Sequence, residues 1–481
     1  MKLITKKTGI LLSVIAFIEI ISFLGYFYPD LKIISAIVAT IIVAIMTFKN
    51  LENGLLIMFT ELIIGSKGHL LELGPVSIRI IIFTIIILAY LLKLTHKEER
   101  AKITSYLKSF KFWPYFLGLA AFILIALANA FIQRNSFANI FSDINAWVFF
   151  LLLFPILSVY YQADEKTYRR LAQTITAAFL WLCFETLIIL FIFTHNLIVA
   201  GELYRWLRIT GVAEITNTIG SWPRIFLQSQ IYASIALVMI PFLLNIKNKN
   251  AWLIMIGAWS VCILSMSRSF WLATAAVLFL SLLGQLIFFG AKNFWSKLLL
   301  ITASATASVL LIIIIIMIPL STEQGSFSAN SFIERASLDS GEAAIASRWS
   351  LLPALWHKVT DHPLIGSGFG SEVTYKSSDP RVLQSNPTGE YTTYAFEWGY
   401  LAFWLKLGLF GLLAYLALLV SFIYRGLLKY RQNNILAGAL ALGALVLVIT
   451  HFFTPYLDHP LGIGYLVLAA VLMEALPLQK N

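Results

Sequence analysis

Apolar stretches close to the length of a bilayer crossing recur from one end of this chain to the other. Examples are residues 9–28, 113–131 and 298–320, and about 20 such residues in helical form cross the hydrocarbon core of a membrane. Of the 481 residues, 59% are hydrophobic and only 12% are charged, and the mean hydropathy is +0.83. A β-barrel would instead alternate apolar and polar residues in segments of about ten. The sequence therefore predicts an all-α, polytopic transmembrane helix bundle.

The apolar segments predict about 12–14 spans. They begin near residues 9, 31, 51, 78, 113, 147, 171, 227, 251, 270, 298, 395, 434 and 461. The first run is too long for a signal peptide and no small-residue cleavage site follows it, so we interpret it as the first span. We expect three regions: a transmembrane bundle of about eleven spans in residues 1–320, a large extracytoplasmic loop with short helices in residues 321–394, and further spans in residues 395–481.

The net charge of +11 is spread over the segments between the apolar runs. With both termini in the cytoplasm, the inner segments hold most of the cations, as the positive-inside rule requires. The inner cations are mostly lysine, whereas the outer ones are mostly arginine. Arginine binds phosphate or carboxylate oxygens two at a time, so its enrichment outside indicates an anionic ligand, with ordinary loop arginines as the alternative. The outer arginines are Arg79, Arg134, Arg205, Arg208, Arg224, Arg268, Arg335, Arg348 and Arg381.

Several classes of site lack support in the sequence. Cys183 and Cys262 both fall inside apolar runs, which leaves neither a disulfide framework nor a thiolate metal site. There is no G-x-x-x-x-G-K-[ST] motif, so the chain contains no recognisable nucleotide-binding loop. The outer histidines lack a spacing such as H-E-x-x-H, and no metal site is predicted. These histidines are His357, His362, His451 and His459.

Three ionisable residues fall within predicted spans. Glu19, Glu185 and Lys406 occupy positions where a charge is unfavourable and often functional. They keep an ion-coupled transporter open as an alternative function. The paired, Gly/Pro-interrupted helices typical of such transporters are not evident.

Two outer segments between spans place arginines at the membrane boundary. Residues 195–226 begin with an amphipathic pattern that we expect to lie along the membrane surface. Its apolar and basic positions are Leu203, Arg205, Trp206, Leu207 and Arg208. Arg224 heads an apolar run, and Arg268 lies in the short hairpin SMSRSFW. Because Arg268 has no loop to retreat into, it must reach water or face an anionic partner.

The large loop has three parts. Residues 321–331 are rich in Ser, Gly and Asn, and we expect them to be flexible. Residues 342–359 show apolar side chains at helical spacing on the same face as Arg348. The segment DHPLIGSGFG follows, and its glycines allow tight turns and close backbone approach to a ligand. These glycines are Gly366, Gly368 and Gly370.

Beyond the loop, Glu397 is predicted to begin a long span. On a helix it would share a stripe with Tyr400, Leu401 and Trp404, which places a carboxylate beside aromatic surface at the outer boundary. A solvated helix cap is the alternative interpretation of this glutamate.

Four segments in a fixed order carry a family resemblance. They are an arginine heading a span (WPRIFLQSQIY), the Ser-Arg-Ser hairpin, an outer loop containing SRWSLLPALWHKVTDHPLIGSGFG, and a span with Tyr400 and Leu401 before GLFG. Over roughly residues 220–415, the chain resembles the bacterial O-antigen ligase and O-antigen polymerase superfamily.

The resemblance implies a glycosyltransferase that needs neither metal nor cofactor. Its donor would be a polyprenyl-diphosphate-linked glycan on the outer face of the membrane. Arg224, Arg268 and Arg348 match the family's arginines and imply diphosphate binding. Eleven residues before the glycine of the G-x-x-G turn, where the ligases have a histidine, this chain has Glu397. We expect Glu397 to be the general base of an inverting displacement. Additional candidate site residues are Arg205, Arg208, Tyr400 and His362.

The glutamate in place of histidine favours an O-antigen or exopolysaccharide polymerase. An O-antigen ligase or a protein O-oligosaccharyltransferase would differ only in acceptor, and a polysaccharide flippase or ion-coupled transporter is the alternative from another class. The implied partners are the lipid-linked donor, a glycan acceptor, the lipid bilayer and a chain-length regulator protein, without nucleic acid. The expected location is the bacterial cytoplasmic (inner) membrane, with the active site outside and both termini inside.

Overall fold

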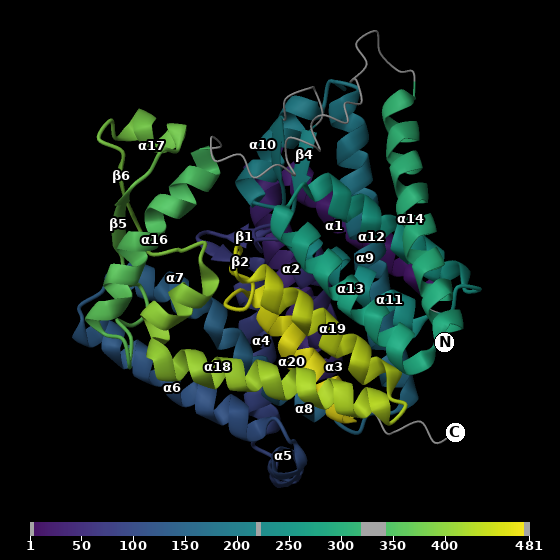
Figure 1. The fold of residues 1–481 in the computed structure, drawn as a ribbon, viewed down its shortest axis with the longest axis horizontal. Helices are drawn as coiled ribbons and strands as arrows, with labels where there is room; N and C mark the ends of the chain where they lie inside the picture. The colour runs from purple at the N-terminus through teal and green to yellow at the C-terminus, as the bar shows by residue number, and fades with distance from the viewer. Residues whose placement is uncertain (1–3, 218–222, 319–342, 476–481) are drawn as a thin grey trace.

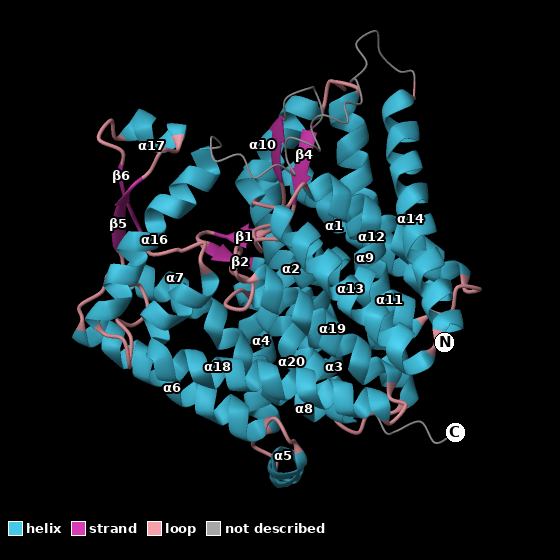
Figure 2. Ribbon diagram, in the orientation of Figure 1, coloured by secondary structure: helices cyan, strands magenta, loops and turns pink. Residues whose placement is uncertain are grey.

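Helices account for nearly all of the described structure. The computed structural model describes residues 4–217, 223–318 and 343–475. Within these ranges the helices form one bundle with three short antiparallel strand pairs (Figures 1 and 2). The predicted all-α, polytopic fold is confirmed. The predicted flexible stretch, residues 321–331, lies outside the described residues.

The helices are α1 (Lys6–Phe27), α2 (Pro29–Lys49), α3 (Leu51–Ile64), α4 (Ile78–Lys93), α5 (Lys97–Ser109), α6 (Trp113–Ile132), α7 (Phe137–Trp147), η1 (Val148–Leu152), α8 (Leu153–Tyr160), α9 (Glu165–Thr194), α10 (Ala200–Thr210), η2 (Gln228–Gln230), α11 (Ile231–Leu243), α12 (Lys249–Ser265), α13 (Arg268–Phe289), α14 (Ala291–Met317), α16 (Ala343–Asp361), α17 (Pro380–Ser385), α18 (Gly399–Arg431), α19 (Ile435–Thr450) and α20 (Pro460–Ala475). The strand pairs are β1 (Glu72–Leu73) with β2 (Val76–Ser77), β3 (Glu214–Asn217) with β4 (Pro223–Phe226), and β5 (Val373–Lys376) with β6 (Glu390–Thr393).

Every predicted apolar segment overlaps a helix, but fewer helices than predicted are long enough to span. In the described part of the chain, eight helices have the length and composition to cross a membrane, or up to nine if α4 and α5, bent by 109°, are one span. The segments at α11, α12, α19 and α20 are shorter apolar helices. The span predicted to start near residue 147 belongs to a helical stretch that starts earlier, at Phe137. The sequence count of 12–14 thus included apolar helices shorter than the roughly 20 residues of a bilayer crossing.

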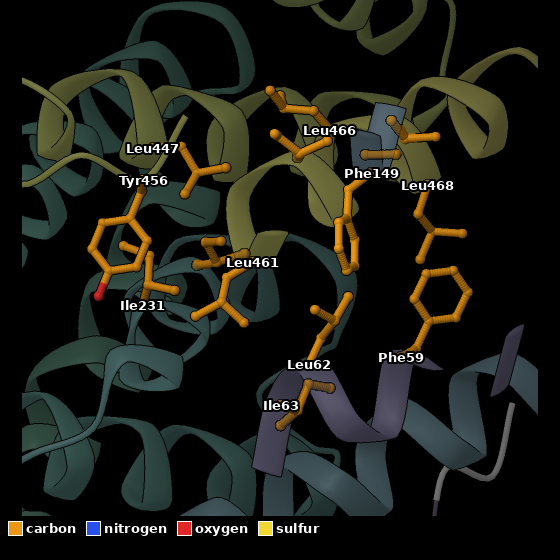
Figure 3. Close-up of a cluster of buried hydrophobic side chains, with 14 of the residues drawn as sticks. Phe59, Leu62, Ile63, Phe149, Ile231, Leu447, Tyr456, Leu461, Leu466 and Leu468 are labelled. Atoms are coloured by element: carbon orange, nitrogen blue, oxygen red, sulfur yellow. The ribbon is translucent and has the colours of Figure 1, made fainter. Parts of the chain in front are cut away.

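The short helices α3, α19 and α20 form the centre of the bundle. Small residues in α19 allow close approach to α20: a side chain on Gly443 would collide with the Tyr465 hydroxyl, which donates a hydrogen bond to Leu440 O (2.8 Å). Figure 3 shows part of this core, where side chains from α3, η1, α11, α19, α20 and the α19–α20 turn converge. The labelled residues are Phe59, Leu62, Ile63, Phe149, Ile231, Leu447, Tyr456, Leu461, Leu466 and Leu468.

Polar elements gather at two ends of the bundle. In Figure 1, α10, α16 and the strand pairs lie toward the top and left, whereas α5 and the turn after α18 lie toward the bottom and right. Basic residues belong to the second end, since α5 begins at Lys97 and the turn after α18 follows Lys429 and Arg431. The candidate site residues predicted from the sequence belong to the first end, which we call the loop end.

The long helix α18 is broken at Gly408, which has φ 73° and ψ 175°. The turn that follows α16 pairs with the break. The Ser367 N–H donates to Leu405 O (2.7 Å), and the Leu409 N–H donates to Pro363 O (2.9 Å). The break would otherwise leave amides and carbonyls of the helix without hydrogen-bond partners. These hydrogen bonds to the turn supply partners, so irregular backbone is tolerated inside the bundle.

The three glycines of this turn bring backbones together. Gly366, Gly368 and Gly370 all have φ between 74° and 82°. A Cβ on Gly368 would overlap the backbone of Ala130 in α6, and one on Gly370 would lie 2.7 Å from Ile140 N in α7. The sequence interpretation that these glycines approach a ligand is wrong for these contacts, since the neighbouring backbone belongs to the protein itself. The turn therefore fixes the loop on the membrane helices.

We expect Gly368→Ala to lower the melting temperature of the detergent-purified protein more than Gly74→Ala does. Both glycines have positive φ, at 82° and 59°, and this backbone strain costs about 1–2 kcal/mol in each variant. A Cβ at Gly74 meets nothing within 4 Å, whereas one at Gly368 overlaps α6. Equal shifts in a thermal unfolding assay would contradict the close-approach role of the glycine turn.

Candidate active site

Arg348 and Glu397 form an ion pair at the loop end of the bundle. The predicted helix in the loop is confirmed as α16, which carries Arg348. The Arg348 Nε–H donates to Glu397 Oε2. The side chains are 40% and 51% exposed, so a solute can reach both. The structure thus brings together Arg348, which was predicted to bind the diphosphate, and Glu397, which was predicted to be the general base.

Glu397 precedes α18 and does not lie on it. The helix begins at Gly399, where any side chain would overlap the His451 backbone, and Trp398 is its N-terminal cap. The Tyr400 hydroxyl donates to Val448 O in α19 (2.8 Å) and thus points into the bundle. The predicted helical stripe of Glu397 with Tyr400 is therefore wrong. This placement leaves Glu397 on the short segment between β6 and α18, beside α16.

Aromatic side chains surround the ion pair. The Trp398 Nε1–H donates to Arg348 O (2.9 Å), and the Trp398 ring lies edge-on to Trp349 with centroids 5.4 Å apart. The ring centroid of Trp398 is also 6.1 Å from that of Phe453. Trp349 is 58% exposed and Phe453 is 38% exposed. Such rings combine a large apolar surface with polar edges, which suits the boundary between lipid and water.

Arg224 and Arg268 lie together at another part of the same end. Arg224 is on β4, and its Nε–H donates to Ser265 O (3.1 Å) at the end of α12. Its guanidinium carbon is 4.8 Å from the Phe226 ring centroid. Arg268 begins α13, three residues after Ser265. The amides at the start of this 22-residue helix add a positive potential to that of the two guanidinium groups.

The α19–α20 turn contacts residues next to Arg268 and next to Glu397. Thr454 Oγ1 lies 3.0 Å from Ser269 Oγ, next to Arg268. Its neighbour Phe453 contacts Trp398, next to Glu397. A single short turn therefore connects the Arg348–Glu397 pair with the α13 start. We call these parts together the candidate site.

Glu214 on β3 lies among cations at the edge of the candidate site. The Lys67 ammonium is 2.8 Å from Glu214 Oε1. Burial acts to raise the pKa of this carboxyl, but the hydrogen bond and charge of Lys67 and the charges of Arg224 and Arg208 outweigh it, so the pKa lies below its ordinary value. Arg208 is therefore close enough to the β3–β4 pair to contribute to its potential.

The remaining predicted residues have more local roles. The 65% exposed Arg205 pairs with Glu202 one turn earlier on α10 (3.0 Å). His362 O accepts a hydrogen bond from Gly366 N–H (2.9 Å), which starts the glycine turn. Arg79 is buried and paired with Glu61 (2.7 Å), so it stabilises the bundle. Arg335 lies outside the described residues. Within those residues, no group of three His, Cys, Asp or Glu side chains is placed to hold a metal ion.

A buried charge cluster beneath the candidate site was not foreseen from the sequence. Lys406 Nζ lies 2.7 Å from Asp143 Oδ1, while Asp143 Oδ2 accepts a hydrogen bond from Gly370 N–H (2.7 Å). The lysine is also 5.4 Å from the ring of Phe396, next to Glu397. Lys406 could have indicated this cluster from the sequence, because an ammonium group inside a bundle needs a carboxylate partner.

Asp458, in the α19–α20 turn, adds a third charged group to this cluster. Burial raises the pKa of its carboxyl to about 6, although the charge of Lys406 acts in the opposite direction. Its Oδ1 has no hydrogen-bond partner among the described residues. The cluster therefore joins the glycine turn, α7, the broken α18 and the α19–α20 turn below the candidate site.

We expect Lys406→Met to destabilise the protein strongly and Asp143→Asn to restore much of that loss. Removing one partner of a buried pair typically costs about 3–5 kcal/mol because the other charge stays buried. Asparagine removes this charge but retains an oxygen that accepts from Gly370 N–H. Thermal unfolding of the single and double variants measures the coupling.

The exposed pair Lys358–Asp361 (3.1 Å) is the matched control, and Lys358→Met should change the melting temperature little. Additive losses in Lys406→Met and Asp143→Asn would show that the two charges do not depend on each other.

Much of the candidate site lies in a region that matches a known protein family. Residues 251–416 match the O-antigen ligase family. The match includes Arg268, Arg348 and Glu397, whereas Arg224 precedes it. A search of curated proteins found no match. For residues 251–416, the match confirms the resemblance to the O-antigen ligase and polymerase superfamily that was identified from the sequence.

Proposed function

We propose that this protein is a polymerase-type glycosyltransferase that joins glycans from a polyprenyl-diphosphate-linked donor to a sugar hydroxyl. The observation that carries the proposal is the accessible Arg348–Glu397 pair within the family-matched region. It places a carboxylate that can accept a proton directly beside a group that can bind phosphate. Arg224 and the start of α13 provide a second cationic group at the same end of the bundle.

The proposed reaction is a single displacement at the anomeric carbon of the donor. Glu397 accepts the proton of the acceptor hydroxyl while the hydroxyl oxygen attacks that carbon. The bond between the anomeric carbon and the phosphate oxygen breaks, and its electron pair leaves with the polyprenyl diphosphate. The attack from the opposite face inverts the anomeric configuration. The proton on Glu397 then passes to solvent through its exposed side.

The arginines would stabilise the charge that develops on the leaving diphosphate. Guanidinium groups bind phosphate oxygens in pairs, and fixed donors act most strongly where charge appears in the transition state. We assign this role to Arg224 and Arg268 at the α13 start. Arg348 has a double role, because its Nε holds Glu397 while its terminal nitrogens can face the donor. A metal-independent mechanism follows from the family resemblance.

The choice of polymerase over ligase rests on Glu397. Ligases resembling this chain have a histidine in this register, so the base here differs in chemical type. We further propose that the candidate site faces the outside of a bacterial cytoplasmic membrane and that both termini are cytoplasmic. The lysine-rich turns at the opposite end of the bundle support this orientation through the positive-inside rule. A chain-length regulator protein is a further proposed partner.

A transporter remains the alternative from a different class. Glu19 and Glu185 are buried in α1 and α9, and Glu185 has no hydrogen-bond partner for either oxygen among the described residues. Lys406, the third in-span charge, is paired with Asp143 below the candidate site. Flux of glycan or ions in proteoliposomes without bond formation would favour this alternative over the glycosyltransferase.

We expect Glu397→Gln to lower turnover by about 10²–10⁴-fold, because a general base typically contributes that much. The measurement is polymer formation from a lipid-linked oligosaccharide by the purified protein in liposomes. Glu390→Gln is the control, since Glu390 is an exposed glutamate on β6 in the same loop. The parent product should remain attached to polyprenyl diphosphate.

Two outcomes would overturn separate parts of the proposal. If Glu397→Gln retains turnover within a few-fold of the parent, Glu397 is not the base. If the parent transfers its glycan to lipid A-core or to a protein, the enzyme is a ligase or a protein O-oligosaccharyltransferase and the polymerase assignment fails.

We expect Arg268→Ala to lower turnover about 10- to 100-fold and Arg268→Lys to lower it less. A hydrogen bond to a charged group contributes about 1.5–3 kcal/mol, and lysine retains the charge without the fork. Arg169→Ala, at an exposed arginine paired with Glu165 outside the site, should leave activity unchanged. Equal activity of the parent, Arg268→Ala and Arg268→Lys would exclude a role of Arg268 in donor binding.

A further inference from the structure

A cavity of about 570 Å³ lies between α11, α13, α18 and α19, away from the candidate site. Its walls are mainly hydrocarbon, with the polar groups of Gln285, Tyr430 and Arg431 at one part of the lining. The other lining residues are Phe242, Leu280, Ser281, Gly284, Ile423, Leu427, Gly438, Ala439, Ala441, Leu442 and Leu445. The volume falls in the range of roughly 300–1,000 Å³ that is typical of small-molecule sites.

Small residues create this hollow. Gly284 on α13 faces open space, since a Cβ added there would meet nothing within 4 Å. Ala439 and Ala441 line it from α19. Gln285 Nε2–H donates to the Tyr430 hydroxyl (2.6 Å), which ties α13 to the end of α18 beside the cavity. The cavity is thus held open by helices that are linked to each other.

Two cationic side chains lie at the cavity, near the end of α18 that is far from the candidate site. Arg431 lines it directly at the end of α18. The Lys297 ammonium on α14 is 5.9 Å from the ring centroid of Phe242, another lining residue. Arg431 and Lys297 thus bring two cationic side chains to this cavity.

The surrounding bilayer limits which molecules this cavity can bind selectively. An acyl chain leaves other hydrocarbon when it enters an apolar cavity in a membrane protein, so the hydrophobic effect provides little net affinity. Packing in the cavity also does not distinguish between lipids, because any acyl chain of suitable size can fill it. Discrimination must therefore come from the headgroup, and basic pockets between transmembrane helices bind anionic headgroups.

We propose that this cavity binds an acyl chain of an anionic phospholipid, with the headgroup phosphate near Arg431 and Lys297. Charge complementarity selects the lipid, and the small side chains of α13 and α19 make room for its chain. The leaflet that contacts this end would be the cytoplasmic one if the lysine-rich turns lie inside. The site is separate from the proposed glycosyl transfer and does not depend on it.

Native mass spectrometry of the full-length protein in detergent tests this proposal. The probes are phosphatidylglycerol and phosphatidylcholine of identical acyl chains, titrated into delipidated protein. We expect one phosphatidylglycerol to bind in preference to phosphatidylcholine. Arg431→Gln and Lys297→Gln should each weaken phosphatidylglycerol binding about fivefold, because one cation near a lipid surface contributes about that factor. Phosphatidylcholine binding should not change.

Gly284→Phe should abolish the bound phosphatidylglycerol by filling the cavity. Gly118→Phe is the matched control: Gly118 is a partly buried glycine in α6 whose added Cβ also meets nothing within 4 Å, and it does not line the cavity. Equal binding of the two lipids, or unchanged phosphatidylglycerol binding in Gly284→Phe, would overturn the proposal. A protein dimer that Gly284→Phe dissociates would instead identify the occupant as a second copy of the chain. The charge variants provide an independent test if Gly284→Phe does not fold.

Discussion

The buried pair between Lys406 and Asp143 is the interaction on which the loop end of this protein depends. A lysine in a membrane helix requires a carboxylate partner, and here that partner comes from α7 and also accepts the Gly370 amide. The pair thus joins α18, α7 and the glycine turn in one place. The backbone exchange at Gly408 uses the same turn, so the break in α18 and the path of the loop are a single structural feature.

This feature determines where the proposed chemistry can occur. Because the glycine turn is fixed to α6, α7 and α18, the preceding α16 lies beside the segment before α18, and Arg348 reaches Glu397. Asp458, in the α19–α20 turn, belongs to the same cluster, and Phe453 and Thr454 of this turn contact Trp398 and Ser269. Groups from distant parts of the chain are therefore positioned by backbone contacts deeper in the bundle, which lets their side chains remain accessible.

The sequence predicted the helices, the helix in the loop and the family, because each depends on local pattern or motif order. It did not predict which apolar segments form helices shorter than a typical membrane crossing, since a run of apolar residues does not show where a helix begins and ends. It placed Glu397 on a helix because helical spacing continues back from Tyr400, whereas the contact of Gly399 with His451 starts the helix later. The partners of Gly368, Gly370 and Lys406 come from α6 and α7, more than 200 residues earlier, and no local pattern encodes such contacts.

The contacts show that the outer arginines do not all have the same role. Arg79 is buried against Glu61, and Arg205 pairs within its own helix, so both are explained by structure alone. Arg348 instead holds a carboxylate at an accessible surface, and Arg224 lies at the start of α13 near Arg268. Lysine suffices where only sidedness or a diffuse positive potential is needed, whereas bidentate recognition of phosphate oxygens needs the planar fork. Arg224, Arg268 and Arg348 are therefore the outer arginines that we assign to the proposed diphosphate site.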